Sequence, residues 1–139
     1  MDKKFKREIS ALDDIFGFVD NFIASNGIGD AAGFSTRLAV EETFTNLVRH
    51  NSGGLDHIFI SLNIDRDTNR LIIQLKDFNV ENFDKTKIKS AEVHLPLSEK
   101  KIGGLGTHLI KNAVDTIKYD YKNRTLCITA IKNLEEKDV

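Results

Sequence analysis

The chain has 139 residues, a formal net charge of −1 and an apolar fraction of 40%, which together predict one globular domain with a sizeable core. Its basic and acidic residues are interleaved, so the charge pattern gives no signal for direct binding of nucleic acid or of an anionic membrane. A single cysteine, Cys127, excludes an internal disulfide and a cysteine metal cluster. The sequence has no secretory core and no membrane-spanning run, so we expect a cytoplasmic protein.

The first part of the chain predicts two helices. Residues 9–26 have apolar side chains at spacings of three and four, the pattern of an amphipathic helix. These side chains are Leu12, Ile15, Phe16, Val19, Phe22 and Ile23. The sequence SNGIGD should end this helix, because Gly27 and Gly29 are helix-stop signals. We expect a second helix from about residue 31 to about residue 51, where NSGG ends it.

The pattern then changes to one typical of strands. Residues 57–64 (HIFISLNI) and 70–77 (RLIIQLKD) each alternate along the chain, and the turn-forming sequence DRDTN separates them. The two segments therefore predict a β-hairpin.

A third helix and a second pair of strands are predicted near the C-terminus. The helix should run from residue 105 to about residue 117. The strands IKYDY (117–121) and TLCITAIK (125–132) follow, with a turn at Asn123 between them. The polar tail at 133–139 is expected to fray and to be disordered.

A stretch of about 25 residues between Asp77 and Gly103 shows only weak periodicity. Loops of this length are uncommon in compact domains and are often functional lids, although a surface insertion is the alternative. The stretch contains the single proline, Pro96, and ends with Lys100 and Lys101. We expect a lid over about residues 78–106.

The second predicted helix carries a polar stripe. Glu42, Asn46 and His50 are spaced four apart, so they share one helix face. A solvated face is the simpler explanation of this stripe. The functional alternative is that the carboxylate takes a proton from a hydroxyl or a water, while the amide oxygen one turn later is a ligand for Mg²⁺. His50 fits a structural hydrogen bond better than a metal site, because no second ligand is spaced near it.

Asp77 ends a row of apolar residues. Strand alternation places it on the same face as Leu71, Ile73 and Leu75. Because an ionised carboxylate buried without partners is costly, either the strand end opens to water or Asp77 accepts hydrogen bonds in a pocket. The exocyclic amine of adenine is a suitable donor for such a carboxylate.

The sequence IGGLGTHLIKNAVDTI, residues 102–117, places three glycines directly before the third predicted helix. A tight turn would explain them. The alternative is a phosphate cradle, in which bare backbone N–H groups and the helix dipole attract an anion. The residues of this predicted cradle are Gly103, Gly104, Leu105, Gly106 and Thr107, with charge from Lys100 or Lys101. The spacing differs from that of the dinucleotide fingerprint and of the P-loop.

Together these motifs resemble the Bergerat-type ATP-binding fold of the GHKL or histidine-kinase-like ATPases. The order is EETFTN on a helix, a strand ending in aspartate, a long lid, and GGLG at a helix start. Among proteins with this fold, the chain is similar to a compact, stand-alone form, the anti-sigma-factor serine kinases of bacterial stress and sporulation switches. The resemblance covers most of the chain and implies an α+β two-layer sandwich, with helices on one face of a mixed, mostly antiparallel sheet.

The resemblance also implies roles for individual residues. Glu42 corresponds to the catalytic base, Asn46 to the Mg²⁺ ligand and Asp77 to the adenine-binding aspartate. The glycines at 103, 104 and 106 correspond to the phosphate-contacting glycines of the lid hinge. The implied cofactors are ATP and Mg²⁺.

Two positions depart from the family pattern. Asn79 stands where the family usually has glycine two residues after the adenine-binding aspartate. Asparagine is the non-glycine residue best suited to left-handed backbone geometry, so we expect the turn to be kept. Phe83-Asp84 is followed by Lys85 where a proline is common. Both departures bear on ATP affinity more than on the fold.

Family resemblance implies a serine kinase that phosphorylates an anti-anti-sigma protein and sequesters a sigma factor, often as a homodimer. The rival hypothesis is a non-catalytic binding module that keeps the scaffold for the same regulatory partners. A detached histidine-kinase catalytic domain fits less well, because no phospho-acceptor helix pair is expected before the domain.

Overall fold

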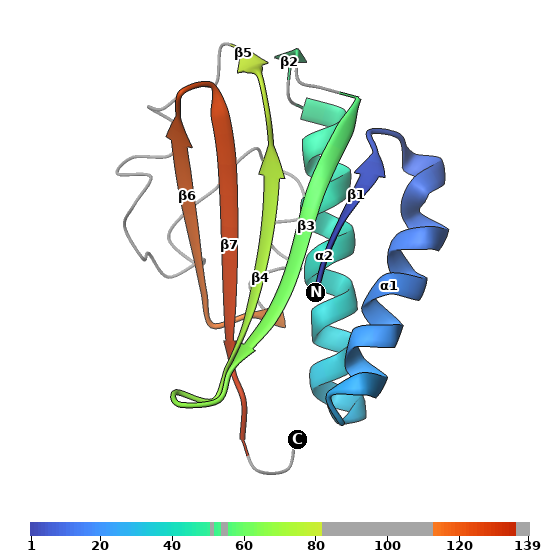
Figure 1. The fold of residues 1–139 in the computed structure, drawn as a ribbon, viewed down its shortest axis with the longest axis vertical. Coiled ribbons are helices and arrows are strands. Elements are labelled where there is room, and N and C mark those ends of the chain that lie inside the picture. The colour runs from blue at the N-terminus through green and yellow to red at the C-terminus, as the bar shows by residue number, and fades with distance from the viewer. Residues whose placement is uncertain (51, 54–55, 82–112, 136–139) are drawn as a thin grey trace.

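The computed structural model describes residues 1–50, 52–53, 56–81 and 113–135 (Figure 1). The predicted glycine cradle, all but the last residues of the third predicted helix, and residues 82–106 of the predicted lid lie outside the described residues.

Two helices form where the sequence predicted them. A short 3₁₀ turn, η1 (Ile9–Ala11), leads into α1 (Leu12–Ser25), and α2 spans Asp30–His50. Gly27 has a φ of 64° between the helices, a conformation that glycine adopts without a steric penalty. A Cβ atom added at Gly33 would lie 3.3 Å from Ile23, so this glycine allows α1 and α2 to approach closely. No described helix is long and apolar enough to cross a membrane.

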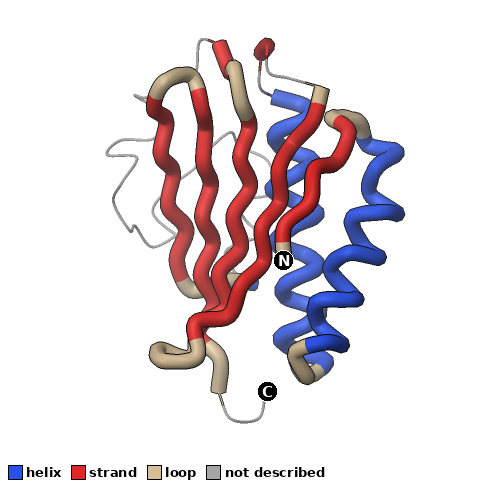
Figure 2. Tube along the Cα trace, in the orientation of Figure 1, coloured by secondary structure: helices blue, strands red, loops and turns tan. Residues whose placement is uncertain are grey.

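The main sheet has five strands in the order β1-β3-β4-β7-β6, and every described pairing is antiparallel (Figure 2). The strands are β1 (Asp2–Lys6), β3 (His57–Asp65), β4 (Arg70–Asp77), β6 (Thr116–Lys122) and β7 (Thr125–Asn133). A second, two-stranded sheet pairs β2 (Ser52–Gly53) with β5 (Val80–Glu81). The predicted β3–β4 hairpin and the β6–β7 pair are confirmed, and the described sheet is antiparallel where the resemblance implied a mixed one.

Several details of the prediction are corrected. The sequence analysis did not predict β1, which pairs with β3 along its whole length. The third predicted helix ends before residue 117, because Thr116 and Ile117 already belong to β6. At the C-terminus β7 continues to Asn133, and Leu134 is buried with its backbone bonded to Asn69. Of the expected tail, Asn133 is therefore the exposed last residue of β7, and Leu134 is packed.

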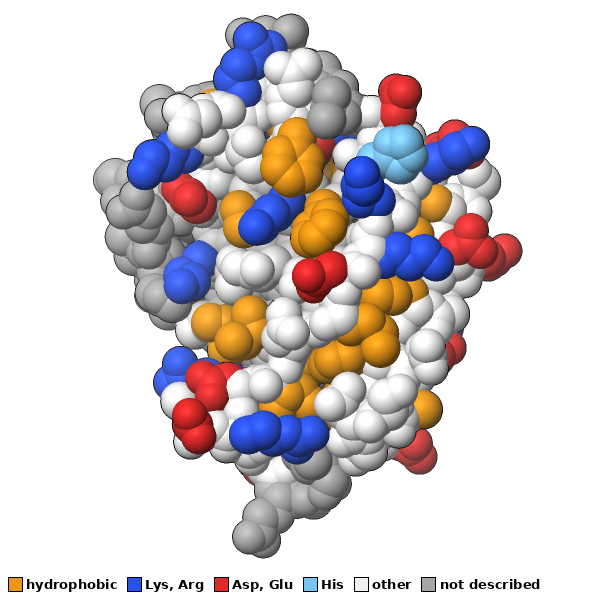
Figure 3. All heavy atoms as spheres, viewed as in Figure 1, with side chains coloured by type: hydrophobic (Ala, Val, Ile, Leu, Met, Phe, Trp, Pro, Cys, Tyr) orange, Lys and Arg blue, Asp and Glu red, His pale blue; other side chains and the backbone are white. Residues whose placement is uncertain are grey.

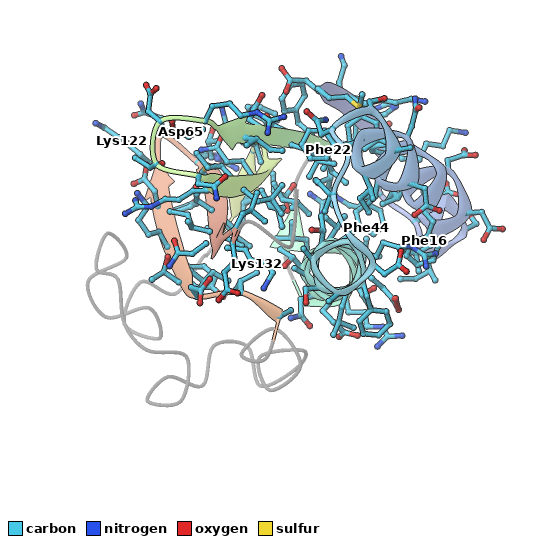
Figure 4. All side chains as sticks on the ribbon, turned by 90° about the horizontal axis from the view of Figure 1, so that it is seen from below. Phe16, Phe22, Phe44, Asp65, Lys122 and Lys132 are labelled. Atoms are coloured by element: carbon cyan, nitrogen blue, oxygen red, sulfur yellow. The ribbon has the colours of Figure 1, made fainter. Side chains whose placement is uncertain are left out.

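The core lies between the sheet and the helices, which form two layers (Figures 1 and 4). Its inward side chains follow the alternation of the strands, as in Ile58, Ile60 and Leu62 of β3. From the helical layer, Phe22 and Phe44 are buried. Burial of this apolar surface is the main stabilising term for such a domain. The α+β two-layer architecture implied by the resemblance is confirmed.

The outer face of the sheet carries mixed side chains (Figure 3). Phe59, Ile72 and Ile131 are half-buried there, and lysines stand between the apolar groups. Cys127 of β7 is a half-buried free cysteine on the same face, consistent with a packing residue.

Candidate functional site

Asp77 lies at the end of β4 on the core face of the sheet. Its cross-strand neighbours are Ile58 of β3 and Leu126 of β7, and its side chain is 0% exposed. The predicted alternation with Leu71, Ile73 and Leu75 is therefore confirmed. The alternative of an exposed strand end is excluded, and Asp77 is a buried acidic group.

A cation far away in the sequence pairs with this carboxylate. Arg7, which follows β1, makes an ion pair through Nη2 with Oδ1 of Asp77. The Arg7 side chain is 14% exposed, and burial lowers the pKa of its guanidinium, although an arginine remains protonated. The Nη1 group of Arg7 donates a hydrogen bond of 3.2 Å to the carbonyl oxygen of Leu47 in α2. Arg7 thus joins the end of β4 to the last turns of α2.

The turn after Asp77 is held by the β6–β7 hairpin. Asn79 has a φ of 58°, the left-handed geometry that the sequence predicted for this position. At the next residue, the Val80 N–H donates to the Arg124 carbonyl at 2.8 Å, and the Tyr121 hydroxyl donates to the Val80 carbonyl at 2.6 Å. Asparagine therefore serves the turn in place of the glycine usual in the family.

Replacing Asn79 by valine should destabilise the fold by about 1–2 kcal/mol, because a β-branched residue is strained in left-handed geometry. The glycine variant at the same position should stay within about 0.5 kcal/mol of the wild type. Urea unfolding of the three proteins measures the difference. Equal stability of the valine and glycine variants would show that the turn relaxes to another conformation.

Glu42 and Asn46 lie on α2 beside its buried stripe. Both are half-buried, next to the buried Thr43 and Leu47. Partial burial and the neighbouring Glu41 carboxylate raise the pKa of Glu42 above its ordinary value, and the Arg49 guanidinium offsets part of this shift. A raised pKa brings a carboxylate closer to the range in which general bases work.

The structure brings α2 and Asp77 to the same end of the molecule. In Figure 1, β4 and α2 both end at the upper edge, where β5 and β2 lie. Asn46 directly precedes Leu47, whose carbonyl accepts from the arginine that pairs with Asp77. The predicted general base and Mg²⁺ ligand thus lie on α2, and the predicted purine acceptor lies at the end of β4. The Arg7 side chain contacts both elements.

The other predicted site residues cannot be placed. Gly103, Gly104, Leu105, Gly106 and Thr107 lie outside the described residues, and so does the side chain of His50. Among the described residues, no group of three or more His, Cys, Asp or Glu side chains is arranged to hold a metal ion. The predicted Mg²⁺ ligand on α2 is the amide oxygen of Asn46. It suits Mg²⁺, which takes few protein ligands and completes its shell with phosphate and water oxygens.

Arg7 and Tyr121 contact the predicted site but were not predicted from the sequence. Arg7 follows a short strand, KKFK, in which only Phe5 is apolar, so its inward direction had no visible signal. Tyr121 was placed on a strand, but its bond to Val80 depends on tertiary contact with the turn after β4. If residues 2–7 are taken as a strand, two-residue alternation places Arg7 on the same face as the buried Phe5 and so indicates that its side chain points inward.

The chain is similar in sequence to one protein family and to several curated proteins. A sequence model of the histidine kinase-like ATPase domain family matches residues 5–132. The chain is 31% identical over 127 residues to the serine-protein kinase RsbW of Listeria monocytogenes serotype 4a, with 84% of this chain and 80% of the relative covered. The RsbW of Listeria innocua is 30% identical over the same length and coverage.

Two solved structures share the fold. One contains the RsbU and RsbW domains of Rv1364c from Mycobacterium tuberculosis, with a TM-score of 0.67 and 12% identity. It aligns with 96% of this chain, which spans 32% of that longer chain. The other is the SiaB–SiaC complex from Pseudomonas aeruginosa, with a TM-score of 0.63 and 12% identity over 94% of this chain and 88% of the matched chain.

Proposed function

The chain belongs to the histidine kinase-like ATPase domain family, with RsbW serine kinases among its relatives, and from this we propose that it is an ATP-dependent serine kinase and anti-sigma factor. The observation that supports the proposal is that α2, which carries the half-buried Glu42 and Asn46, is joined through its Leu47 carbonyl and Arg7 to the buried Asp77. By their place in the motifs, Glu42 is the proposed base, Asn46 the proposed metal ligand and Asp77 the proposed adenine acceptor.

Glu42 is the proposed general base. Its carboxylate accepts the proton of a substrate serine hydroxyl while the serine oxygen bonds to the γ-phosphorus of ATP and the bond to the departing ADP breaks. The raised pKa of Glu42 favours this role, because a carboxylate of higher pKa is a stronger proton acceptor. Phosphoryl transfer otherwise depends on positioning and on charge neutralisation.

Asn46 and Asp77 are the proposed nucleotide-binding residues. Asn46 offers its amide oxygen to Mg²⁺, which when bound neutralises phosphate charge. Asp77 accepts a hydrogen bond from the exocyclic amine of adenine. The residues Gly103–Thr107 are the proposed phosphate cradle, by their sequence alone.

The proposed partners follow from the relatives. The RsbW relatives are serine-protein kinases, and SiaB forms a complex with SiaC. We infer that the substrate is a small anti-anti-sigma protein phosphorylated on serine, and that the same domain binds a sigma factor, as a monomer or a homodimer. The alternative is a non-catalytic module that binds these partners.

Transfer of labelled γ-phosphate from Mg-ATP to a purified anti-anti-sigma protein from the same organism tests the proposal. We expect label on a serine of that protein, and none when Mg²⁺ is chelated. Binding of the partner without any transfer of label would contradict kinase activity and would favour the non-catalytic module.

A further inference from the structure

Arg7 is a half-buried cation with partners in α2, at the end of β4 and just before β3. Its backbone N–H donates to the Asp56 carbonyl at 2.7 Å, which fixes the start of the side chain beside the entry to β3. Its guanidinium then contacts Asp77 at the end of β4 and the Leu47 carbonyl of α2. Three elements therefore determine its position.

The Leu47 contact orients the guanidinium. Leu47 lies in the last turn of α2, where carbonyl groups lack helical N–H partners and the helix dipole favours positive charge. A guanidinium is planar and rigid, so fixing one of its nitrogens on Leu47 restricts the direction from which another meets Asp77. Lysine could supply the charge, but it has no rigid pair of nitrogens to contact Leu47 and Asp77 together.

The ion pair also determines the chemistry of Asp77. A buried carboxylate without a cation is neutralised by taking up a proton, because desolvation disfavours its charge. The protonated form has an O–H donor, whereas the ionised form can only accept hydrogen bonds. The flanking strand residues, Ile58 and Leu126, are apolar, and Arg7 makes an ion pair that favours the ionised form.

We propose that Arg7 is a positioning residue that makes Asp77 select 6-amino purines over 6-oxo purines. The inference rests on the proposed nucleotide site. An ionised Asp77 accepts from the 6-amino group of adenine and repels the 6-oxo group of hypoxanthine or guanine. Without Arg7, a protonated Asp77 donates to a 6-oxo group, and the discrimination decreases.

Titration calorimetry with Mg-ATP and Mg-ITP tests this role in the full chain, since inosine differs from adenosine at the 6-position of the base. We expect the wild type to favour ATP by about tenfold or more. Arg7→Met should lower this ratio at least about fivefold, whereas Arg7→Lys should keep it within about threefold of the wild type. A wild-type ratio in Arg7→Met would overturn the inference.

Arg37→Met is the matched control. Arg37 pairs with Asp20 at 3.1 Å on the helical surface, with side chains 42% and 57% exposed, so the same substitution there should leave the ratio unchanged. A reduced ratio in this variant would overturn the inference, because selectivity would then follow general destabilisation.

A second uncharged variant at position 7 separates an effect on folding from an effect on nucleotide selectivity. If Arg7→Met does not fold, Arg7→Gln keeps a donor without charge and should have a lower ratio than Arg7→Lys. Equal ratios in these two variants would overturn the role of the charge. A wild type that binds neither nucleotide would refute the proposed ATP site itself, and the inference with it. Binding of ATP with an unchanged ratio in the Arg7 variants refutes only the inference.

Discussion

Glu42→Gln should lower the rate of phosphoryl transfer by about 10²–10⁴-fold while changing Mg-ATP affinity little, because glutamine keeps the shape of the side chain but cannot accept the serine proton. Single-turnover transfer of labelled phosphate to the anti-anti-sigma protein measures the rate, and calorimetry measures the affinity. Glu41→Gln is the comparison variant at the adjacent, similarly half-buried glutamate, which acts on Glu42 through its charge and should lower the rate far less than Glu42→Gln. Unchanged transfer by the Glu42 variant would exclude Glu42 as the base.

The pH dependence of the wild-type rate provides a second check of the same residue. Burial and Glu41 raise the pKa of Glu42, and only the ionised carboxylate can accept a proton. The rate should therefore fall as the pH drops through a pKa above the ordinary range of glutamate. Loss of this inflection in Glu42→Gln is expected, whereas its persistence would assign it to another group.

Arg7→Met should destabilise the fold by about 3–5 kcal/mol, because it leaves the fully buried Asp77 without its cation. That is a large part of the stability of an ordinary domain. Urea unfolding measures the loss, and Arg37→Met at the exposed pair should cost no more than about 1 kcal/mol.

A double variant separates the ion pair from packing. Arg7→Met combined with Asp77→Leu removes both charges and should recover most of the stability lost in Arg7→Met alone. A double variant as unstable as the single one would show that the cost comes from packing or from the Leu47 contact. The double variant should no longer bind ATP, since the proposed adenine acceptor is absent.

Most of the described fold follows from local patterns. The apolar spacing of residues 12–23 sets the inner face of α1, and the alternation in 57–64 and 70–77 sets the faces of β3 and β4. Because Asp77 continues that alternation, its burial could be predicted. Tyr121 and Leu126 occupy the same cross-strand row as Asp77, which also follows from alternation once the strand register is known.

Other features depend on tertiary contacts that no local pattern shows. The segment DKKFK has one apolar residue and becomes a strand because β3 offers an edge with which it can pair. Arg7 is charged and follows a lysine-rich run, which is typical of a solvated segment. Its burial depends on Asp77 and Leu47, which are distant in the sequence. The end of the third predicted helix was wrong because Thr116 and Ile117 pair with Ile131 and Ala130.

The proposed nucleotide site joins α2 to the end of β4, and thermal unfolding with and without Mg-ATP measures whether it binds the nucleotide. At about 100 times its dissociation constant, the nucleotide should stabilise the wild type by about 2.7 kcal/mol. This stabilisation should be lost in both Asn46→Ala and Asp77→Ala. No shift at millimolar Mg-ATP, or a full shift in either variant, would contradict the account.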